Sequence, residues 1–225
     1  MIEVLQNLQE VEAATKALQN QNLPRHITPE KNWDQWLLAQ LLQETLDSGR
    51  GDQSSIRVLD LGCGDCCTLE FLAALGFKDL HGIDLTIKAS EALLYQLYAG
   101  DLTATKFADA SFDVALSISV IEHGVNLEAF FEETYRLLKP GGFLFVTTDY
   151  WQDKISVDAS IQPFGLQWSI FSKAEIQEAM TIAKTHGFVL HQVCEIPNCA
   201  ETTVSWYEKN YTFIALAFRK PSEDV

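Results

Sequence analysis

The segment between residues 56 and 84 constrains the fold more than any other part of the chain. The apolar run Ile56–Leu61 predicts a strand, Cys67–Leu75 predicts a helix, and Leu80–Asp84 predicts a second strand. Gly62 and Gly64 lie between the first strand and the helix, where they permit a tight turn. Because two strands joined through a helix lie parallel in one sheet, this segment predicts an α/β layer structure.

The rest of the chain continues this alternation. Further strands are predicted at Tyr95–Ala99, Phe112–Ser119, Phe143–Thr148, Phe188–Glu195 and Tyr211–Arg219, and further helices at Thr86–Leu93, at Leu127–Leu138 and from the Ser172–Glu175 capping box to Gly187. The last two strands follow one another directly, which predicts an antiparallel pair. We therefore expect a Rossmann-like, doubly wound, mostly parallel seven-stranded sheet with a C-terminal antiparallel hairpin, and ligands at the carboxyl ends of its strands.

Two helices are predicted before the sheet. One runs from Ile2 to a stop near Pro24, and the other runs from Asn32 to Gly49. We expect residues 1–50 to form a helical cap and residues 51–225 to form the α/β domain. The segment 150–171 is rich in aromatic residues without clear periodicity, and we expect a loop over the site.

The net charge of the chain limits the kinds of partner that it can bind. Sixteen Lys and Arg residues stand against 31 Asp and Glu residues, which gives a net charge of −15. Such a field repels phosphate backbones and anionic lipid surfaces, so we expect neither a nucleic-acid nor a membrane partner. No basic residue precedes Lys16 and no apolar leader is present, and we expect a soluble, cytoplasmic protein. The sequence does not define an oligomeric state.

The five cysteines predict reduced thiols rather than disulfides. Their number is odd, and Cys63, Cys66 and Cys67 are crowded into five positions. A zinc site can be drawn from this group with Cys194 and Cys199, but the spacing does not match known zinc sites and no paired histidines accompany it. We expect no zinc.

The glycine loop and the acid after it predict a nucleoside cofactor. Glycines allow a ligand to approach the backbone at a helix N-terminus, and a side chain at Gly62 is expected to occupy that ligand's space. Asp84 ends the neighbouring strand twenty residues after Gly64. A carboxylate there accepts both hydroxyl groups of a ribose.

Charge distinguishes between two nucleoside cofactors. A dinucleotide fingerprint requires a third glycine where Cys67 stands, and Asp60 and Asp65 would repel a pyrophosphate. S-adenosylmethionine carries an ammonium and a sulfonium against one carboxylate, so acidic side chains around the loop favour it. The sequence therefore predicts S-adenosylmethionine rather than NAD.

Five motifs occur in the order of a known family. They are Val58–Gly64, Gly82–Leu85, Gly100–Leu102, Ser111–Val114 and Leu137–Gly142. In this order they resemble the motifs of class I S-adenosylmethionine-dependent methyltransferases of the small-molecule type, and they cover about residues 56 to 149. The resemblance implies a methyltransferase domain over residues 51–225.

The resemblance also implies which residues bind the cofactor. In that family the glycine loop holds the methionine portion, the acid that ends the second strand binds the ribose, and the acid after the third strand binds the adenine amino group. On this chain the implied site comprises Asp60, Gly62, Cys63, Gly64, Asp84, Leu85, Asp101, Leu102 and Ser117. Two departures stand out: Cys66 replaces the usual third glycine, and only seventeen residues separate Asp84 from Asp101, so the helix between them must be short.

The acceptor side is expected at Glu122 and His123, after the fourth strand. This pair resembles the Glu-His of small-molecule O-methyltransferases, including those of ubiquinone biosynthesis, which implies a small-molecule acceptor methylated at a hydroxyl oxygen. Some of those enzymes bind magnesium through a further Glu three residues earlier, where Ser119 stands here. One carboxylate supplies too few oxygen ligands for a hard cation, and we expect no metal.

The role of His123 has two interpretations. In the first, with an ordinary pKa near 6.5, it accepts the proton of a hydroxyl acceptor together with Glu122. In the second, of equal weight, both side chains only cap the next turn and touch the edge of the cofactor. Second candidates are the group Asp149–Trp151, an acceptor wall of Trp168, Trp206 and Tyr211, and a contact of Arg25 and His26 with the cofactor carboxylate.

Two rival functions remain beside a methyltransferase. One is a catalytically silent cofactor-binding subunit that stabilises a partner enzyme and docks through the first helix. The other is a nicotinamide oxidoreductase, which Asp60 and Cys67 disfavour. The sequence leaves the acceptor, and methylation of oxygen rather than nitrogen or carbon, undefined.

Overall fold

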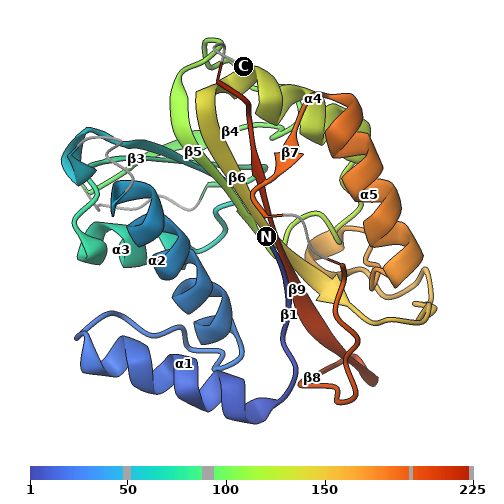
Figure 1. Cartoon of the computed structure of the whole chain (residues 1–225). Coiled ribbons are helices and arrows are strands. Elements are labelled where there is room, and N and C mark those ends of the chain that lie inside the picture. The colour runs from blue at the N-terminus through green and yellow to red at the C-terminus, as the bar shows by residue number, and fades with distance from the viewer. Residues whose placement is uncertain (48–51, 88–93, 193–194, 223–225) are drawn as a thin grey trace.

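A mixed β-sheet forms the middle layer of the molecule (Figure 1). The structure is a computed structural model that describes residues 1–47, 52–87, 94–192 and 195–222. The strands of the sheet follow one another in the order β1-β9-β6-β5-β2-β3-β4, and β7 and β8 also pair with β9. The expected α/β class and the mostly parallel, Rossmann-like sheet are confirmed.

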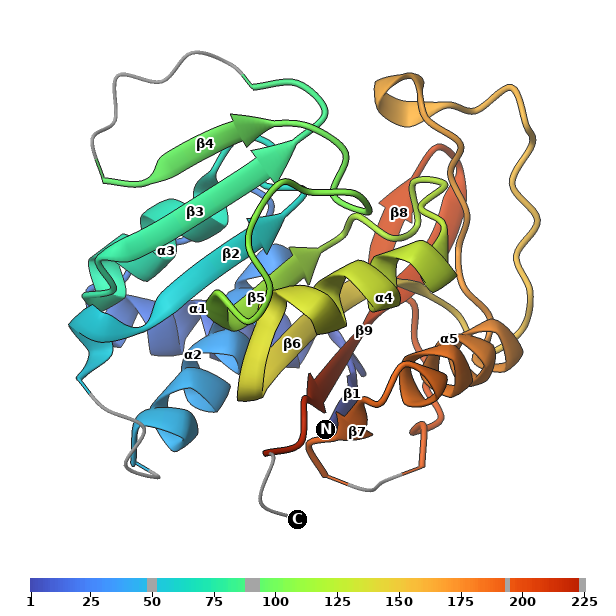
Figure 2. The ribbon, with the colours of Figure 1, turned by 90° about the horizontal axis from the view of Figure 1, so that it is seen from above.

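Five parallel strands form the half of the sheet that carries the site. They are β2 (Arg57–Leu61), β3 (Asp79–Asp84), β4 (Gln96–Ala99), β5 (Phe112–Ile118) and β6 (Leu138–Tyr150). Their pairings are all parallel. Figure 2 shows the arrowheads of β2 to β5 pointing to the same side, toward the loop that follows β6. The strand order reverses between β2 and β5, where a doubly wound sheet opens a crevice.

The antiparallel half of the sheet differs in detail from the prediction. The long strand β9 (Lys209–Arg219) pairs with β6, as expected for the last strand. Its hairpin partner is β8 (Val204–Trp206), which the sequence pattern missed. The predicted strand Phe188–Glu195 is reduced to β7 (Val189–Leu190). The rest of that sheet edge is taken by β1 (Ile2–Val4), a strand where a helix was predicted.

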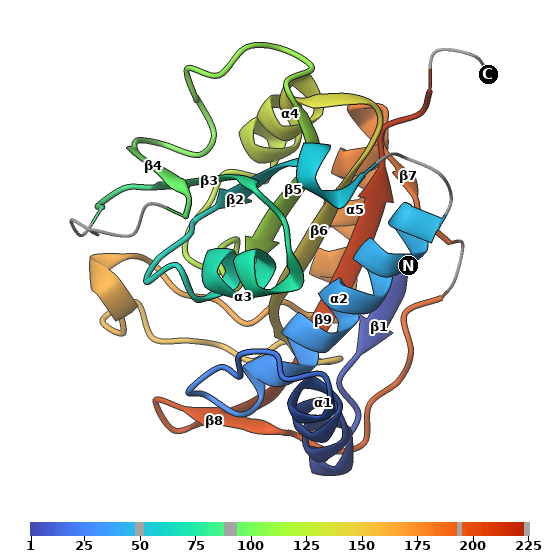
Figure 3. The same ribbon diagram turned by 90° about the vertical axis from the view of Figure 1, so that its left-hand side faces the viewer.

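Helices cover both faces of the sheet. On one face lie α1 (Leu8–Asn20), α2 (Lys31–Asp47) and α3 (Cys67–Leu75), and on the other α4 (Leu127–Leu137) and α5 (Lys173–Thr185) (Figure 1). Figure 3 shows the first three helices in front of the sheet. Two short 3₁₀ helices, η1 (Gln53–Ser55) and η2 (Pro163–Gly165), lie in connecting segments.

Local side-chain contacts explain where the helices begin. The α5 capping box is confirmed, because Ser172 accepts the Glu175 N–H while the Glu175 carboxylate accepts the Ser172 N–H. The Asn126 side chain caps α4 by accepting the Ala129 N–H. The first helix begins at Leu8 rather than Ile2, because Asn7 caps it and residues 2–4 pair with β9 instead.

Several predicted features involve residues outside the described ranges. The helix predicted over Thr86–Leu93 is absent at residues 86 and 87, and residues 88–93 lie outside those ranges. The predicted end of the second helix at Gly49 and the zinc candidate Cys194 also lie outside them. The division of the chain at residue 50 remains a prediction.

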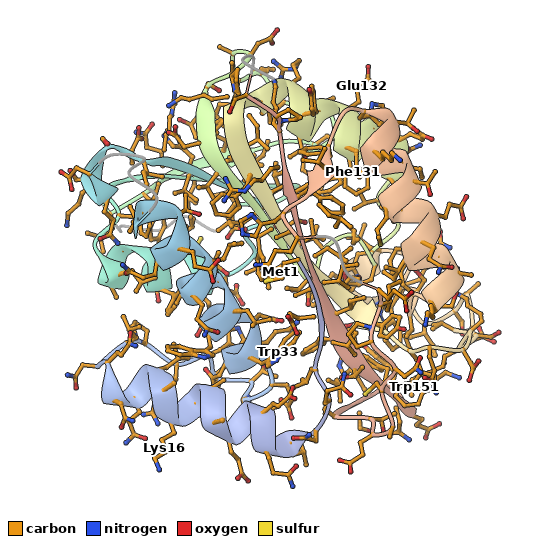
Figure 4. The ribbon with its side chains drawn as sticks, in the orientation of Figure 1. Met1, Lys16, Trp33, Phe131, Glu132 and Trp151 are labelled. Atoms are coloured by element: carbon orange, nitrogen blue, oxygen red, sulfur yellow. The ribbon has the colours of Figure 1, made fainter. Side chains whose placement is uncertain are left out.

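The sheet separates two apolar clusters. Phe130, Phe131 and Phe218 pack with α5 on one side, and Trp33, Leu72 and Phe145 pack with α1 to α3 on the other. Figure 4 shows Lys16 extending from the outer face of α1 into solvent, consistent with its exposed position. In the part of the chain that the structure describes, no helix is long and apolar enough to span a membrane.

Candidate active site

A cavity of about 760 Å³ opens at the carboxyl ends of the parallel strands. Its walls come from the glycine loop, the ends of β3, β4 and β5, the start of α2 and the loop after β6. The lining residues include His26, Ile27, Lys31, Asp34, Gln35, Asp60, Gly62, Cys63, Gly64, Asp65, Asp84, Leu85, Asp101, Leu102, Ser119, Val120, His123, Phe164 and Leu166. Eight of the nine predicted cofactor residues therefore line one cavity, and Ser117 is the exception.

The two loop glycines serve different purposes. Gly62 has φ +87°, and a Cβ built there would lie 2.5 Å from Cγ2 of Val120. The expectation that this Cβ would occupy ligand space is therefore wrong, because it would clash with the protein itself. Gly64 has φ +48°, and a Cβ there meets nothing within 4 Å. Gly64 is thus the glycine that leaves room beside the cavity.

The Asp84 carboxylate lies beside this loop. Its Oδ2 accepts the N–H of Gly64 at 3.0 Å, and its Oδ1 accepts the N–H of Thr86 at 3.3 Å. Each carboxylate oxygen has two acceptor lone pairs, so these bonds fix the carboxylate and leave it able to accept ligand hydroxyl groups. Asp101 is held similarly, by the N–H and hydroxyl group of Thr103 at 2.8 and 2.7 Å.

Asp60 is a strongly perturbed carboxyl group on the cofactor side. It is the penultimate residue of β2, just before the glycine loop, and is 2% exposed. Burial, and then the negative charge of Asp84, raise the pKa of Asp60 from 3.8 to about 7. A cation in the cavity would favour the ionised form of this carboxyl group.

The cysteines of the loop are structural. Burial raises the pKa of each of the Cys63, Cys66 and Cys67 thiols, which disfavours the reactive thiolate. Cys66 has φ +65° at the start of α3. This is the left-handed region that favours glycine, which explains why the resemblance places a glycine there. Cys199 lies elsewhere and donates its thiol hydrogen to the Glu201 carbonyl oxygen at 3.0 Å.

His123 forms the opposite wall of the cavity. Its N–H donates to the Val120 carbonyl oxygen at 2.9 Å, so it sits in a tight turn after β5. Its ring meets Phe164 edge-on at 5.5 Å, and Nδ1 is buried with no hydrogen-bond partner among the described residues. Burial, and then the positive charge of Lys31, lower the pKa of His123 below 6.5. The imidazole is therefore neutral near pH 7 and able to accept a proton.

Glu122 points the other way. It is 1% exposed, it is not among the described residues that line the cavity, and its Oε2 accepts the Thr148 hydroxyl hydrogen at 2.9 Å. Burial and the neighbouring Asp149 raise the pKa of Glu122 to about 8. Ser117 is also fully buried inside β5, away from the cavity.

Lys31 is the site residue that the sequence pattern missed. Its ammonium contacts the Ser119 hydroxyl oxygen, lies 3.2 Å from Asp34 Oδ2 and sits 3.6 Å from the centre of the Phe213 ring. Asp34 itself is 1% exposed in its side chain, and burial raises its pKa. A lysine and an aspartate three residues apart near the start of a helix are the only sequence signal for this pair.

The second candidates divide between the cavity and the core. Asp149 is buried and accepts the Trp168 indole N–H at 2.8 Å, and its pKa is raised to about 6, chiefly by burial. Trp168 and Tyr150 are buried and do not line the cavity. Of Arg25 and His26, only His26 lines it. Across the described ranges, no three His, Cys, Asp or Glu side chains converge in a group that could hold a metal ion.

Comparison with known proteins agrees with this geometry. A family model described as a methyltransferase domain matches residues 59–146. Sterol methyltransferase-like 3 of Botryococcus braunii is 26% identical over 86% of this chain and 54% of its own length. A ubiquinone biosynthesis O-methyltransferase of Chelativorans is 36% identical over 41% of this chain and 40% of its own length. The chain thus spans about half, or less, of the length of these curated relatives.

Solved structures share the fold. An S-adenosylmethionine-dependent methyltransferase of Methanosarcina mazei has a TM-score of 0.59 at 16% identity, over 79% of this chain and 98% of its own. Geranyl diphosphate C-methyltransferase of Streptomyces coelicolor, solved with S-adenosylhomocysteine, has a TM-score of 0.57 at 18% identity, over 88% and 84%. The match over residues 59–146 and the shared fold support a class I S-adenosylmethionine-dependent methyltransferase.

The cavity of the methyltransferase domain fits the cofactor of that family, S-adenosylmethionine. The open space beside Gly64 admits a ligand against the loop backbone. Asp60 and Asp84 place negative charge where a net-cationic ligand is favoured. The residues present therefore suit the cofactor in both shape and charge.

Proposed function

We propose that this protein is an S-adenosylmethionine-dependent methyltransferase that methylates a hydroxyl oxygen of a small molecule. The observation that carries the proposal is His123, a neutral imidazole in the wall of the cofactor cavity, with its ring against Phe164. An imidazole in this state is suited to take the proton of a hydroxyl acceptor. The ubiquinone biosynthesis O-methyltransferases among the relatives support an oxygen acceptor.

The cofactor site follows from the residues that line the cavity. Asp84 accepts the ribose hydroxyl groups, Asp60 faces the cationic methionine portion, and Asp101 with Leu102 receives the adenine. The Gly62–Gly64 loop, with Cys63 at its centre, brings the backbone close to the ligand. Leu85, which is 57% exposed at the mouth of the cavity, covers the nucleoside.

The chemistry needs little from the protein beyond alignment and a base. The bound cofactor supplies a methyl group already activated by its sulfonium. His123 holds the acceptor hydroxyl in line and takes its proton as the new carbon–oxygen bond forms and the carbon–sulfur bond breaks. Burial, and then the charge of Lys31 on the same wall, keep His123 neutral before the reaction.

Glu122 supports this wall from behind. Its hydrogen bond with Thr148 ties the turn after β5 to β6, so we propose that it positions His123 rather than touching the acceptor. The N-terminal residues complete the wall, because His26, Lys31 and Asp34 all line the cavity. This placement supports the division into a helical cap, residues 1–50, and a methyltransferase domain, residues 51–225. The net charge of −15 supports a cytoplasmic protein without a nucleic-acid partner.

Calorimetry with S-adenosylmethionine, S-adenosylhomocysteine and NAD tests the cofactor. We expect both sulfur compounds to bind and NAD not to bind. Asp84→Ala should weaken S-adenosylmethionine binding by well over tenfold, since two hydroxyl groups lose a charged acceptor. The matched control Glu178→Ala removes an exposed acid from α5 and should leave affinity unchanged.

Two results would contradict the proposal. Tight NAD binding, or an Asp84→Ala effect below twofold, would place the nucleoside elsewhere. If both sulfur compounds bind but no S-adenosylhomocysteine forms with a panel of phenols and alcohols, the protein is better described as a cofactor-binding subunit of a partner enzyme.

A further inference from the structure

A row of aromatic rings leads from the catalytic wall to the surface. Phe164 lies 5.5 Å from His123, Trp206 lies 6.3 Å from Phe164, and Tyr207 lies 4.8 Å from Trp206, measured between ring centres. Phe164 belongs to η2 in the loop after β6, whereas Trp206 ends β8 and Tyr207 forms the turn to β9. Two segments that are distant in sequence therefore build one continuous aromatic surface.

Two of the three rings are exposed to an extent that packing does not explain, whereas Trp206 is half-buried against Trp168. Phe164 is 82% exposed and Tyr207 is 51% exposed, and Ile27 on the cavity wall is 92% exposed. Phe164 and Ile27 also line the cavity, so the exposed surface is continuous with the site. Contiguous apolar surface left open beside a cavity is typical of a ligand-binding groove.

The backbone gives an independent reason to look for a function. Phe164 has φ 59° and Tyr207 has φ 44°, both in the left-handed region that bulky residues seldom adopt. Glu208, the second residue of the β8–β9 turn, has φ 59°, so this two-residue turn requires positive φ at both positions. Asn-Gly is the usual solution for such a turn. The chain instead carries an aromatic ring there, at a cost in strain that a role of the ring would explain.

A small polar acceptor would make no use of this row. It would end at His123 and touch Phe164 at most, while Trp206 and Tyr207 lie beyond reach of the reacting oxygen. A longer apolar group attached to the acceptor would cover all three rings and remove their exposed surface from water.

We infer that the methyl acceptor is amphipathic: its hydroxyl group lies at His123 and an apolar tail lies along Phe164, Trp206 and Tyr207. This inference rests on the proposed function, because it assumes that the acceptor reacts at His123. The tail is the occupant of the row, and a lipid bilayer or a second protein molecule is an outcome that the test must separate from it.

The test is the affinity of 4-alkylphenols, from methyl to hexyl, for the full chain saturated with S-adenosylhomocysteine. Each added methylene that reaches the row should tighten binding about fourfold, as full transfer from water predicts. Phe164→Ala and Trp206→Ala should each reduce that step below twofold, and Trp206→Ala, whose side chain does not line the cavity, should leave the affinity for S-adenosylhomocysteine unchanged. Val189→Ala, which removes an exposed apolar side chain from β7, is the matched control and should keep the fourfold step.

Several outcomes would overturn the inference. They are an affinity that does not depend on chain length, a fourfold step that survives both aromatic variants, and no binding of any alkylphenol by a chain that binds S-adenosylhomocysteine. Failure to bind S-adenosylhomocysteine would instead remove the proposed function. Thermal unfolding confirms that each variant folds.

Two further measurements separate the other occupants. If the aromatic variants lower sedimentation with phosphatidylcholine vesicles but keep the alkylphenol step, the row contacts a membrane and the inference is wrong. If they change the mass in analytical ultracentrifugation and keep that step, the row is an interface between two copies of the chain, and the inference is also wrong.

Discussion

Replacing Asp60 by Asn should stabilise the protein and weaken its cofactor binding at the same time. The pKa of Asp60 in the folded chain is about 7 against an ordinary value of 3.8, so the folded chain binds more protons than the unfolded chain between these pH values. The free energy of unfolding therefore falls as pH rises through this window. At about 1.4 kcal/mol for each pKa unit, the loss reaches at most about 4 kcal/mol above pH 7.

Binding of the cationic cofactor should offset this loss of stability from ionised Asp60. A cationic ligand favours ionised Asp60, so binding should release a proton and weaken as pH falls. With a pKa of about 7, the ionised fraction of Asp60 rises about eightfold between pH 6 and pH 7.5, and the affinity for S-adenosylmethionine should rise by the same factor. Asp60→Asn removes both effects: its affinity for S-adenosylmethionine should be lower and nearly independent of pH, and its Tm at pH 7.5 should be several degrees higher.

Calorimetry at pH 6, 7 and 7.5, in two buffers with different ionisation enthalpies, measures affinity and proton release together. Differential scanning calorimetry of the ligand-free chain measures the stability of both forms. Asp65→Asn removes another carboxylate from the same cavity and should retain the pH dependence. The reasoning is refuted if the wild-type affinity is the same at pH 6 and 7.5, or if Asp60→Asn lowers Tm at pH 7.5.

Three further predictions follow from the same geometry. Gly62→Ala should lower Tm strongly because its Cβ meets Val120. Gly64→Ala should fold with a modest loss of Tm and bind S-adenosylmethionine at least tenfold more weakly. Equal losses of Tm in the two variants would contradict the different roles given to the two glycines. His123→Gln should slow methyl transfer about a hundredfold with little change in cofactor affinity. It should also remove the acid limb of the pH–rate profile, which in the wild type lies below pH 6.5 because the pKa of His123 is lowered. An acid limb that persists in the variant would make His123 structural. Glu122→Gln should raise Tm relative to the wild type at pH 7, because the folded chain keeps Glu122 protonated up to about pH 8 whereas the unfolded chain ionises it from about 4.5, and this gain should shrink as the pH falls toward 4.5; a large loss of Tm at pH 7 would show that the ionised form is required.

The cofactor side was predictable because its chemistry is local in sequence. A strand, a glycine loop and an acid on the next strand place Asp60, Gly64 and Asp84 together by topology alone, since parallel neighbours end at the same edge of the sheet. The partner of the Gly62 backbone was not predictable in this way. Val120 lies fifty-eight residues further along the chain, and only the pairing of β2 with β5 brings the two together.

The edge of the sheet shows a second limit. Residues 188–195 carry a strand pattern, yet among its described residues only Val189–Leu190 form a strand, β7, on β9, and β1 takes the neighbouring positions on β9. Ile2 and Val4 are buried on alternate positions, which fits a strand of three residues as well as the start of a helix. A pattern this short does not distinguish the two-residue period of a strand from the 3.6-residue period of a helix. Tertiary contacts decide which segment pairs with the edge of β9.

The acceptor side illustrates why adjacent residues in a motif receive different roles. His123 and Glu122 are neighbours, but the turn after β5 directs one side chain into the cavity and the other into the core. Because successive side chains of the turn point in different directions, only one of the two can reach an acceptor in the cavity. The motif locates the pair, and only the conformation of the turn shows which of the two side chains faces the cavity.

Three buried carboxyl groups lie beneath the wall of the cavity that carries His123, and no sequence motif predicts that they come together. Asp34, Glu122 and Asp149 come from three different elements, and burial raises the pKa of all three. Lys31 lowers each of these pKa values and so offsets part of the cost. A core that needed only stability would replace the group with apolar side chains of similar volume. Its presence next to His123 is therefore best explained by the proposed reaction, because a preorganised set of polar groups beside the acceptor requires little rearrangement when the proton moves.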